Sequence, residues 1–496
     1  MNRTEFSKFL VLFCLATSAV SLRAQEMLGI MNSSYSGITG AVLNPAVTVT
    51  SPYYFDFNIL AGDVFFENNY LYLAKEEYKF SRFLSKNPDF PTHGADNSMI
   101  AYDYYNNKDK NAYANQRILG PSFALTVGRS SFGIVTGSRM VMSTRNVPYD
   151  IAKFIFEKLE YPPQYDTRYQ HTRNIYNAQM AWAEYGFNYS YVLKHLNSDY
   201  WAAGISVKAL KSYAGGYMFG DNEDYMVNDS LIVVNSFTGE VGYSLPLDYE
   251  TNEYIRDPLF RGKGMGVDIG MIYEKKKKGS LNDQRTKKLC SQTYTAYDYK
   301  IGISILDIGR VRFTENAEKL VFGGVPVNWQ PTTGYSVYSV RDVTDTLSQM
   351  FYGNKTDLIQ GHEITIGLPT ALSVQADVNY YKNWYINSTL ILPLQFSKSG
   401  LRRPALLGIA PRYQTARFEA SMPVTLYDWT KPRIGLSARF LGFFVGTEKI
   451  SGFFHFKDFT GLDFYAGVKL SLSKGHCHSK GTENCGIEEY KLFNKH

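Results

Sequence analysis

A set of charged residues recurs at alternate positions within stretches that otherwise alternate apolar with small or polar residues. These are Glu184, Lys208, Asp268, Asp377, Arg412, Arg417, Glu419, Arg439, Asp463 and Lys469. Both signs of charge are present, so two chemistries fit the pattern. The side chains line a polar path for a solute, or they pair with one another inside a closed structure. In either case they must point away from an apolar surface.

His476, Cys477 and His478, followed by Cys485, bring metal-binding residue types together near the carboxyl end. Their spacing matches no standard zinc finger. In an oxidising compartment a disulfide between Cys477 and Cys485 is favoured over a metal site. Cys290 has no evident partner. The sequence therefore predicts neither a metal nor a cofactor.

No local motif assigns a nucleophile and its base. Neither a Gly-x-Ser-x-Gly elbow nor a His-Glu-x-x-His pair occurs. Gly264, Gly266 and Gly270 alternate along an expected strand and do not open a helix, so they do not resemble a phosphate-binding loop closely. They indicate close packing or strand bending. We expect a protein without enzymatic activity.

The amino terminus predicts export from the cytoplasm. Arg3 and Lys8 precede an apolar run, and the small residue Ala24 provides a cleavage site, which together indicate a secretory signal peptide over residues 1–24. Beyond it, no run of about 18 apolar residues occurs that would cross a membrane as a helix. The formal net charge of +6 is small for 496 residues, so nucleic acid is not an expected partner.

The stretch from Ile364 to Tyr380 has the two-residue rhythm of a strand with two different faces. Apolar residues such as Ile366 and Val374 alternate with small or polar ones such as Asp377. At about 17 residues the stretch is long for a soluble sheet, whereas a strand tilted through a bilayer needs about 9 to 11. Aromatic residues make up 15% of the chain, which suits the aromatic girdles of a membrane barrel.

Similar stretches follow one another from Tyr53 to Leu472, and the gaps between them alternate between long and short except at residues 275–299. In hydrocarbon an unpaired backbone amide costs several kcal/mol, so a sheet spans a membrane only when it closes. We therefore predict an all-β fold, a transmembrane antiparallel β-barrel of about 14 strands over residues 52–472 with long extracellular loops. The apolar phase slips near Leu306 and Asp307, which predicts a β-bulge.

Residues 25–51 show neither helical nor strand periodicity and contain Asn44, Pro45 and Ala46. Small residues allow such a segment to lie within a crowded lumen, so we predict an N-terminal plug segment. An unstructured periplasmic leader is the alternative. Residues 473–496 are expected to form a periplasmic tail.

Asn44-Pro45-Ala46 ahead of the first strand resembles the hatch of the FadL-like barrel superfamily of long-chain fatty-acid transporters, which includes the PorV-type barrels of type IX secretion. The segments Gly264–Gly270, Ile303–Gly309 and Leu368–Ala371 are similar to those of a Bacteroidota outer-membrane barrel family of unassigned function. The resemblance spans nearly the whole mature chain and implies a plugged barrel of about fourteen strands. Function in the superfamily ranges from hydrophobic-solute uptake to secretion scaffolding.

We expect a barrel in the bacterial outer membrane that binds or passively transports a hydrophobic or small solute. The alternative is a non-transporting barrel that docks secreted or surface proteins in the manner of PorV, or a structural surface protein. Expected partners are outer-membrane lipid, a hydrophobic small molecule and a periplasmic or secreted protein. A continuous side opening or an apolar pocket behind the plug would favour transport, and a fully sealed lumen with an apolar loop rim would favour docking.

Overall fold

The computed structural model describes residues 27–77, 91–92, 99–157, 161–196, 198–228, 231–277, 296–324, 326–329, 339–454 and 457–473. The expected signal peptide with its cleavage site after Ala24 lies outside these residues. So do Cys290, Cys477 and Cys485, and nearly all of the expected periplasmic tail. The roles assigned to them stay predictions.

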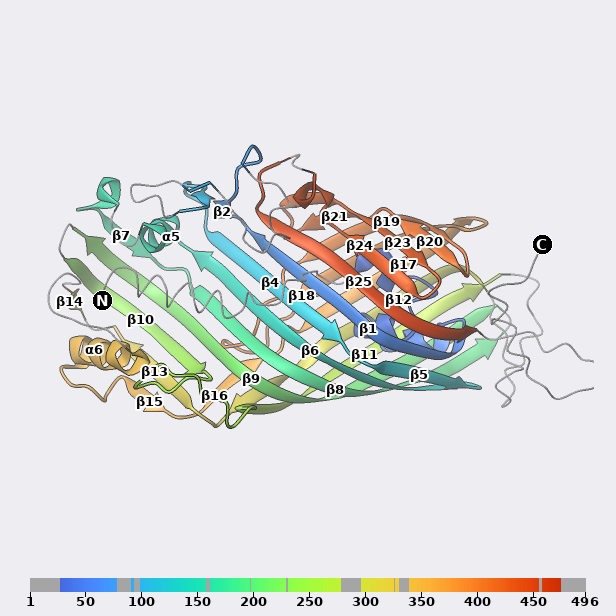
Figure 1. The fold of residues 1–496 in the computed structure, drawn as a ribbon, viewed down its shortest axis with the longest axis horizontal. Helices are drawn as coiled ribbons and strands as arrows, with labels where there is room; N and C mark the ends of the chain where they lie inside the picture. Colours follow the sequence, from blue (N-terminus) through green and yellow to red (C-terminus); the bar gives the residue numbers. More distant parts are fainter. Residues whose placement is uncertain are drawn as a thin grey trace, which may run out of the picture.

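A single large antiparallel sheet closes on itself, because β1 pairs with β25 on one side and with β4 and β5 on the other (Figure 1). Bulges and prolines divide several of its strands into two elements, and the sheet is a closed barrel of 14 strands. The strands are β1 (Tyr53–Asn68), β4 with β5 (Lys110–Leu119, Ser122–Val127), β6 (Ser130–Val147), β8 (Ile175–Leu196), β9 (Asp199–Val227), β11 (Gly262–Lys276), β12 (Tyr297–Phe313), β16 with β17 (Ile364–Gly367, Ala371–Tyr381), β18 (Trp384–Pro393), β19 (Leu406–Gln414), β20 with β21 (Phe418–Ser421, Val424–Tyr427), β22 with β23 (Lys431–Ile434, Leu436–Phe440), β24 (Phe443–Thr447) and β25 (Gly461–Ser473). The predicted fold class is confirmed.

The long connections gather at one end of the barrel and carry further elements (Figure 1). These are β2 (Leu71–Tyr72), β3 (Tyr102–Asp103), α5 (Tyr149–Phe156), η2 (Pro162–Gln164), β7 (Arg168–His171), β10 (Ile232–Ser244), β13 (Ala317–Gly323), β14 (Val327–Trp329), α6 (Val340–Tyr352), β15 (Ile359–Gly361) and η4 (Ile450–Gly452). In the described part of the chain, no helix combines the length and the apolarity needed to cross a membrane. We call the end of the barrel that carries these long connections the long-loop end.

The sequence predicts a long loop over residues 314–362, but the helix α6 lies within it. Its amino terminus is a capping box, in which Ser339 and Asp342 satisfy each other's backbone amides. Gly353 ends it in a left-handed conformation with a φ of 73°. These signals were present in the sequence and were missed.

Along the barrel strands, side chains alternate between the interior and the outer surface. In β9 the interior face carries Ser206 and Lys208, both buried, and the outer face carries Ile205 and Val207, which are 39% and 37% exposed. An outer band of apolar side chains around a polar interior is what strands need between hydrocarbon and a filled lumen. The predicted two-residue rhythm is confirmed here.

The stretch 364–380 departs from its predicted single strand. Pro369 cannot donate to the ladder, and β16 ends before it while β17 begins after it. The alternation changes phase across this break, so Ile364 and Ile366 are buried in the interior rather than on the outer face. The prediction of one uniform apolar face over this stretch is wrong.

Bulges change the phase of two other strands. In β12, Leu306 and Asp307 are both buried and together oppose Asp268 of β11, which confirms the predicted bulge. In β1 the register shifts between Asn58 and Leu60. Uninterrupted alternation from Tyr53 to Val64 predicts Ala61 on the same face as Phe57. Ala61 is instead buried inside, so that prediction is wrong.

The described part of the chain ahead of β1, from Met27 onward, lies inside the barrel. It forms the short helices α2 (Leu28–Met31), η1 (Gly37–Val42) and α3 (Val47–Thr50), and nearly all of its residues are buried. Side chains from around the wall bond to it. Asn387 and Thr389 of β18 accept from Asn32 Nδ2 at 3.1 and 2.6 Å, and on another part of the wall Thr48 Oγ1 donates to Asn188 of β8 at 3.0 Å. We call residues 27–51 the inner segment.

Candidate solute-binding site

Asn44, Pro45 and Ala46 of the inner segment press against the inside of the wall where neighbouring strands present glycines. A Cβ on Gly204 of β9 would lie 2.5 Å from the Ala46 nitrogen, and a Cβ on Gly270 of β11 would lie 2.8 Å from Pro45 Cδ. Gly204 and Gly270 pair directly across the β9–β11 ladder. Glycine is required here because any side chain would occupy the space that the inner segment fills.

The Asn44 side chain ties the inner segment to three strands. Its Nδ2 donates to the Gln375 side chain at 3.0 Å and approaches the carbonyls of Met271 and Ile303 at 3.2 and 3.4 Å. Its Oδ1 accepts from the Ala46 amide at 3.0 Å. An amide side chain can meet all these groups because it both donates and accepts. The residue predicted to belong to the plug motif therefore has a defined docking role.

On the outer surface of the same wall lies an apolar groove with a volume of about 500 Å³. Its floor includes Gly204 and Gly270, and its sides come from β8, β9, β11, β12 and β17. The lining residues are Tyr189, Tyr191, Ala203, Gly204, Ile205, Ile269, Gly270, Met271, Ile303, Ser304, Ile305 and Leu372. The groove forms because the residues at its floor are small and the side chains around them are larger.

One end of the groove reaches an interruption in the β-ladder. Ile305 and Leu372 line the groove and pair with each other, and the pairing of β12 with β17 stops one residue further on, at Leu306. It resumes at Arg310 with β16. Between these points the ladder is replaced by two other hydrogen bonds. The Leu368 backbone N–H donates to the Gly309 carbonyl, and the Thr370 hydroxyl donates to the Asp307 backbone carbonyl.

The interior side of this interruption is apolar. Leu210, Leu306, Val311, Ile366 and Leu368 are buried there in one hydrophobic cluster. The outer groove and this inner cluster are thus two apolar surfaces that meet at a weakened part of the wall. A hydrophobic molecule held in the groove would find compatible surroundings on both sides.

The predicted lumen residues Glu184, Lys208 and Asp268 meet in one buried network around Asp307. Asp307 accepts from Lys208 at 2.9 Å and from two arginines at 2.8 Å, Arg139 and Arg403. The three cations are balanced by three carboxylates, because Glu184 and Asp268 also lie within ion-pair distance of this set. Arg139 and Arg403 were not identified from the sequence, and Asp307 was identified there only as part of the bulge.

A second network joins four further predicted lumen residues. Arg412 pairs with Asp377, and its Nε is 3.8 Å from Glu419, which also lies 3.2 Å from Arg439 Nε. The inner segment joins this network through Ser33, whose hydroxyl donates to Glu419 at 2.6 Å. The network therefore closes around the inner segment instead of lining a free path.

The three remaining predicted lumen residues differ in their surroundings. Lys469 is buried, lies 3.5 Å from Asp56 and donates to the Ser36 carbonyl at 2.9 Å. Asp463 is buried and accepts from the Glu448 amide at 2.8 Å. Arg417 is exposed in the turn after β19, beyond the end of the strand alternation, so its prediction as a lumen residue is wrong.

The interior chemistry is therefore charge pairing around a filled lumen. Among the described residues, no group of three or more His, Cys, Asp or Glu side chains is arranged to hold a metal ion. The paired networks position the wall and the inner segment.

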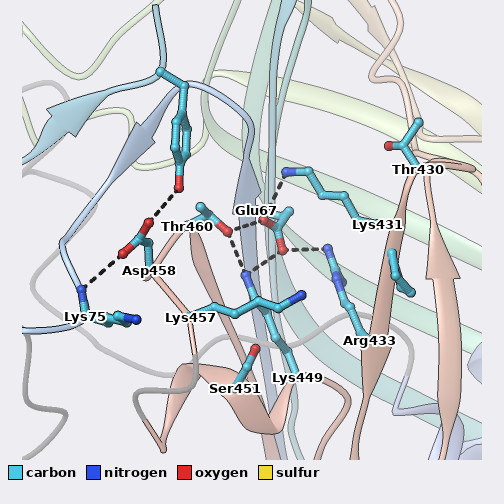
Figure 2. Close-up of a pocket in the computed structure, with 12 residues that line it drawn as sticks. Glu67, Lys75, Thr430, Lys431, Arg433, Lys449, Ser451, Lys457, Asp458 and Thr460 are labelled. Carbon is cyan, nitrogen blue, oxygen red and sulfur yellow. Dashed lines mark hydrogen bonds and ion pairs between the residues drawn. The ribbon is translucent and has the colours of Figure 1, made fainter.

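Sequence reasoning also missed a group of charges at the long-loop end. Lys431, Arg433 and Lys449 all converge on Glu67 of β1, as Figure 2 shows, with Thr460 as a fourth donor. The sequence placed residues 425–433 in a loop, whereas β21 and β22 pair up to a turn at 428–430. Charges at strand ends carry no local signal of a shared partner.

Known structures of two toluene transporters and of a FadL homologue match the overall chain at low identity. The Ralstonia pickettii toluene transporter TbuX shares 10% identity at a TM-score of 0.36, covering 87% of this chain and 93% of its own. The P. putida toluene transporter TodX shares 7% at a TM-score of 0.39, covering 88% and 95%. A Pseudomonas aeruginosa FadL homologue shares 9% at a TM-score of 0.23, covering 91% and 99%.

A search of curated proteins finds no match. A family model does match, over residues 45–448, which is most of the chain and includes the groove, both interior networks and the strands that form the ladder interruption. The chain therefore belongs to the family of unknown function DUF5723.

Proposed function

We propose that this protein is an outer-membrane barrel that takes a hydrophobic solute from the membrane into the groove and passes it inward beside the inner segment. The observation that carries the proposal is the position of the groove. It lies on the apolar outer band, ends where the β12–β17 ladder is interrupted, and backs onto Asn44, Pro45 and Ala46.

The outer band supports a location within hydrocarbon. Ile205, Ile269 and Ile303 on neighbouring strands are 39%, 50% and 50% exposed around the groove. Side chains of this kind are stabilised by lipid, at about 25 cal/mol for each Å² removed from water. Together with the expected export signal, this favours the outer membrane, with the long-loop end outside the cell.

The inner segment supplies the closure. It fills the lumen and contacts the back of the glycine floor, so a solute that crosses the wall must displace part of it. Movement by diffusion fits this arrangement because the interior charges are paired and the closure depends on hydrogen bonds that can reform.

Binding can be tested with N-phenyl-1-naphthylamine, a hydrophobic fluorophore, added to the purified barrel in an uncharged detergent. Ala203 lies in the groove and faces outward, so Ala203→Trp should fill it and weaken binding by about tenfold or more. Ala466→Trp places the same side chain outward on β25, away from the groove, and should leave binding unchanged.

Passage can be tested by the conductance of single barrels in planar bilayers, with and without residues 25–51. Removing the segment should convert rare openings into a steady conductance. If neither form conducts and the fluorophore binds both tryptophan variants alike, the passage proposal fails. That result would favour the alternative of a barrel that docks secreted or surface proteins.

A further inference from the structure

The pocket at the long-loop end has a volume of about 520 Å³ and an unusual balance of charge. Five of its lining side chains are basic and two are acidic: Lys75, Lys431, Arg433, Lys449 and Lys457 against Glu67 and Asp458. The lining therefore carries three more positive than negative charges. A cavity with this excess attracts anions.

The two acidic groups are already engaged by the protein. Asp458 accepts from the Lys75 backbone amide at 3.2 Å and from the Tyr104 hydroxyl at 3.1 Å. This side chain therefore holds the loops together. It keeps its negative charge, which the excess of three positive charges already includes.

Glu67 is saturated in the same way. Its two oxygens lie 3.1, 2.7 and 2.8 Å from the nitrogens of Lys431, Arg433 and Lys449. Among the described residues that line the pocket, three cations on this one carboxylate give an excess of two positive charges. Glu67 is 2% exposed and Arg433 is 7% exposed, so water screens this excess poorly.

Arg433 is held rigidly with spare bonding capacity. Its guanidinium carbon lies 3.9 Å from the Tyr427 ring centre and 4.9 Å from that of Phe65. Its Nε has no hydrogen-bond partner among the described residues. A buried guanidinium with an unused donor is suited to a further acceptor.

The pKa of Lys449 reflects the repulsion among the cations around Glu67. Burial lowers the pKa of its ammonium to about 8, against the opposing effect of Glu67 and with the help of the Arg433 and Lys431 charges. An added anion would relieve that repulsion. Exposed Lys75 and Lys457 stand at the mouth, and Lys457 extends into the same space in Figure 2.

We propose that this pocket binds a phosphate group, either free or carried by a phosphomonoester or a lipid headgroup. A phosphate with a charge of about −1.5 to −2 and several acceptor oxygens matches the excess charge better than a carboxylate does. The volume exceeds that of a bare ion, so it accommodates an attached group. The site is separate from the groove and does not rest on solute passage.

Isothermal titration of the purified barrel in an uncharged detergent tests this directly. The probes are inorganic phosphate, glucose 6-phosphate, the water-soluble lipid dihexanoyl phosphatidate, and acetate as a carboxylate control. Phosphate should bind, and acetate should bind at least about tenfold more weakly. Tighter binding of the sugar phosphate or of the phosphatidate than of phosphate identifies the attached group, and equal binding of all three identifies free phosphate.

Two variants change the pocket in opposite directions. Lys75→Ala with Lys457→Ala removes two exposed positive charges from the pocket and should weaken phosphate binding roughly three- to tenfold. Glu67→Gln removes the resident carboxylate and should tighten phosphate binding by about tenfold or more. Phosphate should also raise the unfolding temperature of Glu67→Gln more than that of the parent protein, because it replaces the lost counter-charge.

Lys355→Ala with Lys398→Ala removes two exposed lysines outside the pocket and serves as the matched control. It should bind phosphate like the parent protein. The proposal is overturned if the folded parent and Glu67→Gln both fail to bind phosphate. Equal affinity in the two double variants, or acetate binding as tight as phosphate, overturns it as well.

Discussion

Replacing Asn44 by alanine should release the inner segment from the glycine floor. The substitution removes two hydrogen bonds at 3.0 Å, to the Gln375 side chain and from the Ala46 amide, together with the longer approaches to Met271 and Ile303. The bond with Ala46 lies within the inner segment, so only the Gln375 bond and the two longer approaches hold the segment to the wall. A buried bond is worth about 1 kcal/mol and the orphaned partners add to the loss, so docking should weaken by about 1 to 2 kcal/mol.

This loss translates into a change of population. A tenfold change corresponds to about 1.4 kcal/mol, so the undocked fraction should rise roughly 5- to 30-fold. In planar bilayers, Asn44→Ala barrels should open more often by about that factor, provided that the closed state still dominates. The measurement is the fraction of time in which a single barrel conducts.

Asn354→Ala provides the matched control. Asn354 follows α6 at the long-loop end and bonds with Thr356 and Asp357 of its own loop. It should leave conductance unchanged. If Asn44→Ala opens no more often than Asn354→Ala, Asn44 does not hold the lumen closed, and the reasoning from the glycine floor is refuted.

Three further predictions concern the wall, the interior and the long-loop end. Gly204→Ala places a Cβ 2.5 Å from the inner segment, so it should raise conductance, whereas Gly361→Ala, whose nearest contact is 3.8 Å, should not. Asp307→Asn leaves three buried cations with a weaker partner and should lower the free energy of unfolding by about 3 to 5 kcal/mol, measured by urea titration in detergent. Local stability around β7 should fall as pH rises from about 5 to about 8, measured by hydrogen exchange corrected for intrinsic rates.

The sign of the pH effect follows from two groups beyond the apolar band. Burial raises the pKa of Glu223 to about 7, so the stability of its protonated form is lost as pH rises from 4.5 towards 7. The hydrogen bond to Asp150, at 2.9 Å, raises the pKa of His171 above 6.5, and its contribution is lost as pH rises through the raised value. Both groups act in the same direction. Unchanged exchange in the parent, or the same pH response in a Glu223→Gln, His171→Asn variant, would contradict this assignment.

For Asp307→Asn the comparison is Asp357→Asn, which alters a carboxylate in the loop after α6. That exposed change should cost less than about 1 kcal/mol. Equal unfolding midpoints for the two variants would show that the buried network does not stabilise the barrel.

The sequence by itself determined the barrel, because alternation is a local property. A strand has two faces, and the type of residue at every second position states which face meets hydrocarbon, as Ile205 and Lys208 do in β9. The bulge at Leu306 and Asp307 was visible for the same reason, since a change of phase can be read from neighbouring residues. Nearly all the charged residues predicted to lie in the interior are buried, as the alternation requires. The prediction is wrong for Arg417 because it lies in a turn, where alternation no longer applies.

Tertiary structure alone decided which of these residues meet. Closure brings Glu67 beside Lys449 across 382 positions and sets Asn44 against Gln375 across 331. Register, strand tilt and the curvature of the wall choose such partners, and none of these is encoded within one segment. The groove likewise depends on Gly204 and Gly270 pairing across β9 and β11. The local alternation determines which face of the strand each side chain lies on, while only the closed sheet determines which residues it contacts.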